Sequence, residues 1–222
     1  MEFTKEEIAK TIDHTFLNPD GKMSDIEKLC EEAAEYGFAS VAVAPDFVEY
    51  AAQKLAGTGV EIDVAVGFPL GYNTTGTKVF ETKESIELGA TEVDMVVNIS
   101  AVKDHNWDKV KDDIEQVAEA CGDITLKVIF ETCYLTEEDI RKLAEICLEI
   151  DGVDYIKTST GFGPEGATVE NVRIMKDAVG EQKKVKAAGG IRSLADYKRM
   201  REAGAVRIGS SSGLKIIAEL EE

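Results

Sequence analysis

The stretch SDIEKLCEEAAEYGFASVAVA, residues 24–44, contains one helix signal followed directly by one strand signal. Ser24 and Glu27 have the three-residue spacing of a capping box, and Gly37 provides a helix stop. The seven residues after that glycine are almost all apolar and include two valines, as expected of a buried strand. The stretch therefore predicts a helix over 24–36 and a strand over 38–44.

The same two signals alternate along the rest of the chain. Short runs rich in Val and Ile predict further strands at 62–68, 92–98, 126–131, 153–157, 185–188 and 206–208. Segment 12–15 (IDHT), after a predicted helix over 5–10, can supply an eighth strand at the start of the series. Helical periodicity fills the intervals at 77–89, 105–121, 136–150, 168–179 and 194–204.

Strands that alternate with helices of this length indicate βαβ units and a parallel sheet covered by helices. Eight such units in 222 residues fit an α/β protein of the (β/α)8 TIM barrel type, a single domain over 1–222. An open, doubly wound sheet is the alternative. It is disfavoured because no G-x-G-x-x-G follows the first strand, where dinucleotide-binding versions carry it.

Charge and hydropathy limit the kinds of partner that we expect this protein to bind. The net charge is −18, whereas nucleic-acid binding normally requires a basic patch, so we expect no nucleic-acid partner. No apolar run approaches the roughly 18 residues of a membrane span, and the first ten residues lack the apolar core of a signal peptide. We therefore expect a cytoplasmic protein with no membrane partner.

Metal and cofactor motifs are missing from the sequence. No two cysteines have the C-x-x-C spacing, and two histidines are too few for the usual Cys/His clusters. We therefore expect neither a metal site nor a bound cofactor. The cysteines are Cys30, Cys121, Cys133 and Cys147, and the histidines are His14 and His105.

Two lysines stand in or at the end of consecutive predicted strands. Lys157 ends VDYIK, and Lys186 lies within VKAA. Because lysine is rarely buried without a partner, burial of both lysines would indicate a functional role. A desolvated lysine beside a second cation becomes a neutral amine and hence a nucleophile. The alternative is that both lysines face solvent or pair with acids.

Asp94 is the third candidate catalytic residue. In EVDMVVN, strand alternation places Asp94 on one face and Val93 and Met95 on the other. A carboxylate in a strand buried on both faces needs a cation or a proton. Proton transfer beside a Schiff-base lysine would meet that need, and a purely structural ion pair is the alternative reading.

Glycines and serines follow the last three strands, which is where TIM barrels commonly bind phosphate. GSSSGLKII reads as a loop and helix start whose N–H groups and hydroxyls face an anion. Arg192 could add a positive charge. Ordinary βα turns are the alternative explanation of these glycines.

Seven motifs, in chain order, resemble deoxyribose-phosphate aldolase over essentially the whole chain. YIKTSTGFG and EVDMVVN are the most specific of them. The full set is IDHTFLNPD (12–20), VGFPLG (66–71), EVDMVVN (92–98), KVIFETCYLT (127–136), YIKTSTGFG (155–163), KAAGGIRS (186–193) and RIGSSSG (207–213).

The resemblance implies a carbon–carbon lyase: a metal-independent class I aldolase of deoxyribose phosphate catabolism. It would reversibly cleave 2-deoxy-D-ribose 5-phosphate to acetaldehyde and D-glyceraldehyde 3-phosphate. Lys157 corresponds to the Schiff-base nucleophile, Lys186 to the lysine that perturbs it, and Asp94 to the proton-transferring acid. The residues implied to bind substrate and its phosphate are Asp13, Thr15, Thr158, Gly161, Gly189, Gly190, Gly209 and Ser211.

Two departures concern the substrate pocket. Ala42 and Ala44 stand where relatives often carry Cys and a polar or aromatic residue, and KAAGGIR and GSSSG each differ by one small residue from commoner forms. Another Schiff-base aldolase or a transaldolase would use the same lysine chemistry, and a non-catalytic phosphate-binding barrel is a rival of a different class. The partner expected is a small phosphorylated sugar, and a homo-oligomer, most simply a dimer, is expected.

Overall fold

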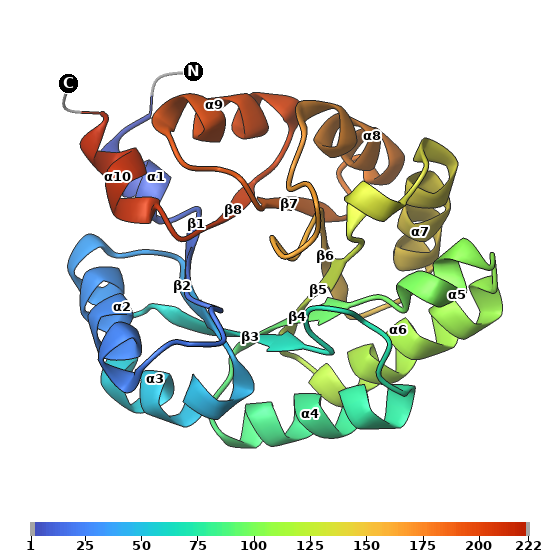
Figure 1. The fold of residues 1–222 in the computed structure, drawn as a ribbon, viewed down its shortest axis with the longest axis horizontal. Coiled ribbons are helices and arrows are strands. Elements are labelled where there is room, and N and C mark those ends of the chain that lie inside the picture. Colours follow the sequence, from blue (N-terminus) through green and yellow to red (C-terminus); the bar gives the residue numbers. More distant parts are fainter. Residues whose placement is uncertain (1–2, 221–222) are drawn as a thin grey trace.

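Eight parallel strands form a closed barrel in the computed structural model, which describes residues 3–220. The strands pair in sequence order, and β1 closes the ring against β8 with Ile12 opposite Ile208. Figure 1 looks down the barrel, with the helices arranged round it. The strands are β1 Ile12–Thr15, β2 Ser40–Val43, β3 Glu61–Val66, β4 Glu92–Val96, β5 Thr125–Ile129, β6 Val153–Lys157, β7 Lys184–Ala188 and β8 Arg207–Ser210. The predicted (β/α)8 class is confirmed.

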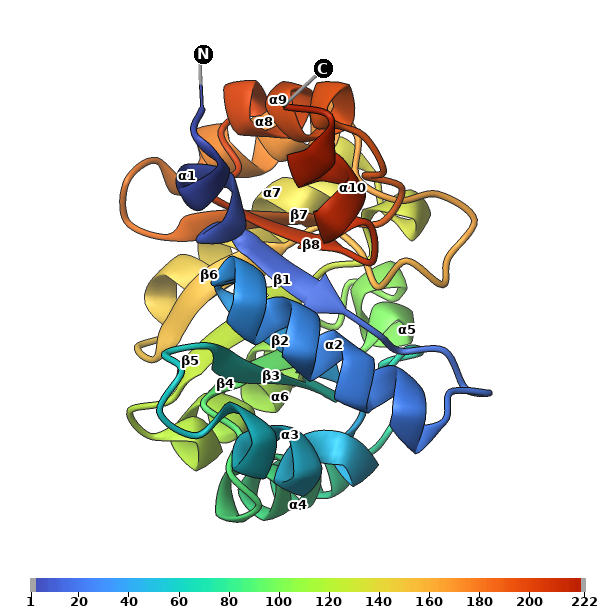
Figure 2. The same ribbon diagram turned by 90° about the vertical axis from the view of Figure 1, so that its left-hand side faces the viewer.

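Helices cover the outside of the barrel, and Figure 2 shows α2 lying over β1 and β2. None of the helices in residues 3–220 has the length and apolarity needed to cross a membrane. The helices are α1 Lys5–Ala9, α2 Met23–Tyr36, α3 Val48–Leu55, α4 Thr75–Glu87, α5 Ile99–Lys103, α6 Trp107–Cys121, α7 Glu137–Glu149, α8 Val169–Val179, α9 Leu194–Ala203 and α10 Gly213–Ala218. Short 3-10 turns occupy Pro45–Phe47 and Thr132–Tyr134.

Several helix boundaries differ from the prediction. The helix expected from residue 24 begins at Met23, so the predicted N-cap Ser24 lies inside it, and the N–H of Lys22 donates to Asp25 instead, at 2.8 Å. The predicted helix over 105–121 begins only at Trp107, and a separate short helix, α5, precedes it. His105 has a φ of 52° between the two, which is incompatible with a continuous right-handed helix.

Strands β3, β4 and β5 each stop two residues before the ends of their predicted ranges, and β2 stops one residue early. After β3, Gly67 has a φ of 61° and the Phe68–Pro69 bond is cis, so the chain turns away from the sheet there. After β5, Glu131 has a φ of 56°. These turns place the residues that follow each strand at the mouth of the barrel.

The side chains of the strands alternate between two environments. Val93 and Met95 on β4 are completely buried in the apolar core between strands and helices, where each contributes about 1.5–3 kcal/mol of burial energy. Glu92 and Asp94 on the same strand pair with cations from other strands inside the barrel. The apolar core therefore lies outside the sheet, and a charged interior lies within it.

Candidate active site

The barrel interior holds four carboxylates and four cations that pair with one another. Seven of the eight side chains are at most 6% exposed, and that of Arg207 is 14% exposed. Isolated charges would be too costly to bury here, but interleaved opposite charges offset that cost. The carboxylates are Asp13, Asp63, Glu92 and Asp94, and the cations are Lys127, Lys157, Lys186 and Arg207.

Lys157 and Lys186 are neighbours, as predicted, because they are register partners on the adjacent strands β6 and β7. The Nζ atoms of both lysines lie 2.6 Å from Asp94 Oδ2. Lys186 also contacts Asp13 at 2.5 Å and Asp63 at 2.8 Å. The structure thus brings the three predicted catalytic side chains together. It excludes the reading in which the two lysines face solvent, and it shows that both pair with acids, as the other half of that alternative had it.

Lys127 belongs to the same cluster and was missed by the sequence analysis. Its Nζ lies 3.1 Å from Asp63, 2.8 Å from Glu92 and 3.0 Å from Asp94, and its side chain is completely buried. A lysine within the apolar run LKVIFE gives the same signal as Lys186 does in VKAA. That signal was present in the sequence and could have identified Lys127.

The three barrel lysines differ in acidity. Burial lowers the pKa of Lys157 and the charge of Lys186 lowers it further, although Asp94 acts in the opposite direction. Burial would also lower the pKa of Lys186, but Asp13, Asp63 and Asp94 raise it above its usual value. The carboxylates likewise raise the pKa of Lys127. Lys157 is therefore the barrel lysine poised to become a free amine, while the other two remain cations.

The buried carboxylates also differ in pKa. Burial raises the pKa of Asp94, but Lys127, Lys157 and Lys186 outweigh that effect and hold it well below the usual value. Burial and the charge of Asp94 raise the pKa of Asp63 to about 6. Asp94 therefore stays ionised beside the lysine amine, whereas Asp63 can hold a proton near neutral pH.

Three of the carboxylates approach one another closely enough to suggest a metal site. Oxygen atoms of Asp13, Asp63 and Glu92 lie within 4.8 Å of one another. Cationic side chains, however, already contact each of them at 2.5–3.1 Å. A divalent ion would have to displace those cations, so the charges at this cluster do not fit a metal site.

A cavity of about 270 Å³ opens at the mouth of the barrel beside the lysine cluster. Lys157 is the one barrel lysine among the described residues that lines it. Of the predicted substrate and phosphate residues, six line this cavity: Thr15, Gly161, Gly189, Gly190, Gly209 and Ser211. Much of the remaining wall is formed by Arg192, Ser210 and the loop residues Phe16, Leu17 and Asn18.

The other two predicted substrate residues lie behind the cavity wall. Asp13 is completely buried between Lys186 and Arg207 in the charge cluster. Thr158 is also completely buried, and its hydroxyl donates to the carbonyl of Ala188 at 3.2 Å. Thr158 therefore ties β6 to β7 and does not line the cavity.

Close backbone packing shapes the glycine side of the cavity. A Cβ on Gly166 would lie 2.2 Å from the carbonyl oxygen of Gly189, and Gly189 itself has a φ of 87°. The N–H of Ala167 donates to the carbonyls of Ala188 and Gly189, at 3.0 Å in each case. The loop after β6 and the loop after β7 are thus held together at a spacing that only glycine permits.

Glu131, at the end of β5, fixes the loop that follows Lys157. Its carboxylate accepts hydrogen bonds from the N–H of Thr160, at 3.2 Å, and from the Thr160 hydroxyl. Glu131 is 2% exposed and adopts the left-handed φ of 56°, which is uncommon for a residue with a side chain. The same hydroxyl of Thr160 accepts the N–H of Phe162 at 3.0 Å, so Glu131 supports two residues that line the cavity.

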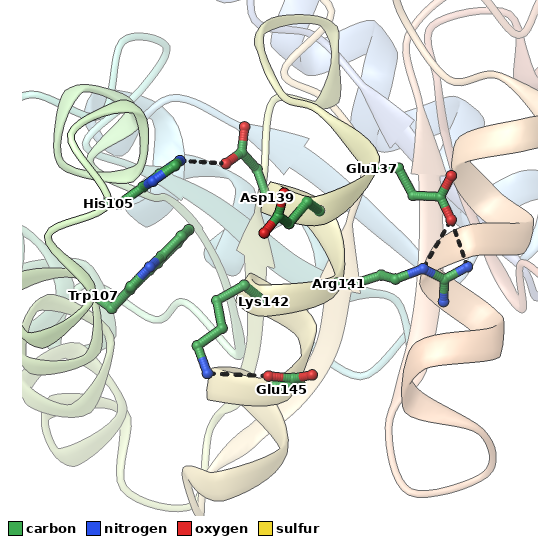
Figure 3. A pocket seen from close by; sticks show the side chains of 8 residues that line it. His105, Trp107, Glu137, Asp139, Arg141, Lys142 and Glu145 are labelled. Carbon is green, nitrogen blue, oxygen red and sulfur yellow. Dashed lines mark hydrogen bonds and ion pairs between the residues drawn. The ribbon is translucent and has the colours of Figure 1, made fainter.

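A larger hollow of about 670 Å³ lies outside the barrel, between the start of α6 and α7 (Figure 3). Most of its charged side chains pair with one another: Lys142 lies 3.1 Å from Glu145, and His105 lies 3.2 Å from Asp139. Figure 3 also shows Arg141 turned to Glu137. Because these groups satisfy one another and none belongs to the lysine cluster, the chemistry is assigned to the barrel mouth despite its smaller cavity.

A parallel eight-stranded barrel with a buried lysine beside a carboxylate, opening on a glycine-lined cavity, is an arrangement suited to an aldolase. The model of the DeoC/LacD family aldolases matches residues 7–219. This chain therefore belongs to that family, and it is a carbon–carbon lyase.

Individual relatives agree with that assignment. The deoxyribose-phosphate aldolase of Thermoanaerobacter sp. strain X514 is 56% identical over 215 residues, which is 96% of each chain. The enzyme of the same name from Staphylococcus carnosus strain TM300 is 51% identical over 213 residues, also 96% of each chain. The resemblance that the seven motifs indicated is thus confirmed.

Solved structures show the same fold. The deoxyribose phosphate aldolase of Aeropyrum pernix, described as a tetramer, superposes with a TM-score of 0.89 at 29% identity, over 99% of this chain and 93% of that one. An aldolase designated QR15 superposes with a TM-score of 0.91 at 42% identity, over 96% of each chain.

Proposed function

We propose that this enzyme reversibly cleaves 2-deoxy-D-ribose 5-phosphate to acetaldehyde and D-glyceraldehyde 3-phosphate through a Schiff base on Lys157. The observation that carries the proposal is that Lys157 combines a lowered pKa with a place in the cavity wall. Lys127 and Lys186 have raised pKa values and do not line the cavity. The identity of the substrate is inferred from the names of the relatives.

Cleavage begins when the neutral amine of Lys157 attacks C1 of the open-chain sugar and water leaves, giving an iminium ion. The iminium draws electrons from the C2–C3 bond as the hydroxyl on C3 loses its proton. The bond breaks, glyceraldehyde 3-phosphate departs, and an enamine remains on Lys157. Protonation of the enamine at C2 and hydrolysis of the new iminium release acetaldehyde and restore the amine. No metal ion is needed, because the iminium acts as the electron sink.

Asp94 is placed to move the protons. Its Oδ2 lies 2.6 Å from Lys157 Nζ, and its lowered pKa keeps it ionised, and so able to accept a proton, at neutral pH. A carboxylate in that place can accept a proton from the protonated amine, and through a water molecule it can serve C2 of the enamine. Lys186 remains charged beside it, and its charge adds to the effect of burial in lowering the pKa of Lys157.

The phosphate binds on the glycine side of the cavity. This side is lined by Gly189, Gly190, Gly209, Ser211 and Arg192, and none of these residues is acidic. Backbone N–H groups in such loops suit an anion. Anchoring the phosphate here fixes which carbonyl carbon of the sugar reaches Lys157.

Borohydride trapping tests the proposal. The protein is incubated with 2-deoxyribose 5-phosphate, reduced with borohydride and digested, and the modified peptide is mapped by mass spectrometry. We expect a reduced adduct on Lys157, in the tryptic peptide that spans it. An adduct on Lys186 would reverse the assignment of the two lysines, and a folded protein that binds the phosphate without any adduct would contradict the Schiff-base mechanism.

The cytoplasmic location and the homo-oligomer, most simply a dimer, stay predictions. Native mass spectrometry tests the second: a mass of twice 24.1 kDa is expected. Fractionation of cells with an antibody against this chain tests the first.

A further inference from the structure

A second hollow, of about 510 Å³, adjoins the active-site cavity at the mouth of the barrel. The loops after β1, β2 and β3 form most of it, and Leu17, Asn18 and Phe162 line both spaces. We refer to it as the side chamber.

The inner wall of the side chamber lies next to the reacting groups. Ala65 lines it, and Ala65 is the register partner of Asp94 on the neighbouring strand. Adjacent strands lie about 4.8 Å apart. Since Asp94 Oδ2 is 2.6 Å from Lys157 Nζ, a group bound to Lys157 is within reach of this chamber.

The lining of the side chamber is mainly apolar and contains no cation among the described residues. The carboxylate of Glu81 accepts the N–H of Gly67 at 2.7 Å, and burial raises the pKa of Glu81. Asp46 is the other acid, and it is exposed. The apolar residues are Leu17, Pro19, Ala44, Pro45, Phe47, Ala65, Phe68, Pro69 and Phe162.

The two spaces therefore differ in the groups they accept. The active-site cavity is lined by glycines, serines and Arg192 and contains no acid among the described residues, so it suits an anion. The side chamber presents apolar surface and two acids, so it repels a phosphate and suits an uncharged alkyl group. The small side chains of Ala44 and Ala65 leave space for such a group in the side chamber. In the chamber wall, the rings of Phe68 and Phe162 pack edge to face with their centroids 5.3 Å apart.

We propose that the side chamber is a subsite for the alkyl group of aldehyde donors larger than acetaldehyde, such as propanal and butanal. This inference rests on the proposed function. The Lys157 amine condenses with the aldehyde and water leaves; loss of a proton from C2 gives an enamine that carries the alkyl group on C2. C2 then bonds to the aldehyde carbon of glyceraldehyde 3-phosphate, whose oxygen takes up a proton. Hydrolysis of the iminium releases a 2-alkyl-2-deoxypentose 5-phosphate and restores Lys157.

The sequence analysis placed Ala44 in the substrate pocket, but the structure places it in the lining of the side chamber and not in that of the active-site cavity. Substitutions at Ala44 therefore test the subsite. Ala44→Phe and Ala44→Val fill the chamber to different extents, and Ala44→Ser is the control that keeps the volume. The kcat/KM of acetaldehyde, propanal and butanal is measured with glyceraldehyde 3-phosphate as acceptor. Cleavage of 2-deoxyribose 5-phosphate and the melting temperature are measured in parallel for each variant.

We expect Ala44→Phe to lower kcat/KM at least tenfold for propanal and butanal, and Ala44→Val to affect butanal more than propanal. Burial of one methylene group changes kcat/KM by about fourfold. Butanal carries an ethyl group on C2 and propanal only a methyl group, so butanal should lose more when the chamber is filled. Acetaldehyde addition and sugar phosphate cleavage should stay within threefold in all three variants. Ala44→Ser should leave every donor within threefold.

Two results would overturn the subsite while the proposed function stands. One is a wild type that cleaves 2-deoxyribose 5-phosphate but gives no product with propanal or butanal. The other is a folded Ala44→Phe or Ala44→Val variant with unchanged donor preference. If the wild type does not cleave the sugar phosphate, the proposed function fails and the inference fails with it.

Discussion

Lys157 and Lys186 share a single oxygen atom, Asp94 Oδ2, which lies 2.6 Å from the Nζ atom of each. The two lysines are register partners on β6 and β7, so the sheet itself sets their separation. Asp94 raises the pKa of both lysines, so the pKa of Lys157 can be lowered while that of Lys186 is raised only if their remaining surroundings differ. They do, because Lys186 has Asp13 and Asp63 in addition.

Lys186→Met should move the acidic limb of the kcat/KM profile to higher pH. The lost cation no longer lowers the pKa of Lys157, and the carboxylates that it neutralised then raise that pKa. Less free amine is present at pH 7, and borohydride trapping of Lys157 should recover as the pH is raised. Lys157→Met is the control and should give no adduct at any pH. An unshifted acidic limb in Lys186→Met would contradict the proposed action of Lys186.

Lys127→Met should lower both stability and kcat. Removing one partner of a buried ion pair costs about 3–5 kcal/mol, measured by chemical denaturation. Because Lys127 lies 3.0 Å from Asp94, we also expect at least a tenfold loss of kcat in the folded protein. Lys78→Met is a matched control, since Lys78 is equally buried and pairs with Asp113 at 2.5 Å between α4 and α6.

The control should lose a comparable amount of stability and keep kcat within threefold at a temperature where both variants are folded. Equal losses of kcat in Lys127→Met and Lys78→Met would show that Lys127 acts only through the stability of the barrel.

Asp63→Asn should change how stability depends on pH. The pKa of Asp63 is raised to about 6 in the folded protein, above the unfolded value of 3.8. Its contribution to stability is therefore fully present below pH 3.8 and is lost as the pH rises through about 6. The Asn side chain stays neutral, so the free energy of unfolding of the variant relative to wild type should rise between pH 4 and pH 7, by the order of 2 kcal/mol. Urea denaturation at both pH values measures this, and a difference that falls with pH would refute it.

The barrel and its two principal lysines could be predicted because their signals are local. Alternating strand and helix periods define βαβ units, and consecutive strands in a parallel barrel are neighbours. Lys157 and Lys186, in consecutive predicted strands, therefore had to be close. The same reasoning placed Asp94 on the opposite face from Val93 and Met95.

The remaining features depend on contacts that strand order alone does not give. Lys127 lies opposite Asp94 on the adjacent strand β4, but its contact with Asp63 on β3 skips a strand and is shown only by the structure. Glu131 combines a left-handed φ with a buried hydrogen bond from Thr160, and the sequence signals neither feature. Thr158 and Asp13 were assigned by resemblance, and their burial behind the cavity wall follows from side-chain packing.

Arg192→Gln should raise KM for 2-deoxyribose 5-phosphate by about tenfold and leave the rate on unphosphorylated 2-deoxyribose unchanged. A charge-assisted hydrogen bond to phosphate contributes about 1.5–3 kcal/mol, and part of that is retained by the neutral amide. Arg199→Gln is the matched control, because Arg199 pairs with Asp196 on the outer helix α9. Equal effects on both sugars would place Arg192 outside the phosphate site.

Glu131→Gly and Glu131→Ala separate backbone strain from loop support. Both variants lose the hydrogen bonds to Thr160, so both should raise KM for the sugar phosphate several-fold. Glycine tolerates the φ of 56° and alanine does not, so Glu131→Gly should be the more stable of the two by about 1 kcal/mol.

Glu131→Gln keeps an acceptor oxygen and should recover part of the lost affinity without relieving the strain. Steady-state kinetics and thermal denaturation of the three variants provide the two readouts. If KM followed stability across the set, so that glycine gave the lowest KM, the effect of Glu131 would be strain alone. If glutamine gave the lowest KM, the carboxylate would act by holding Thr160 in the cavity wall.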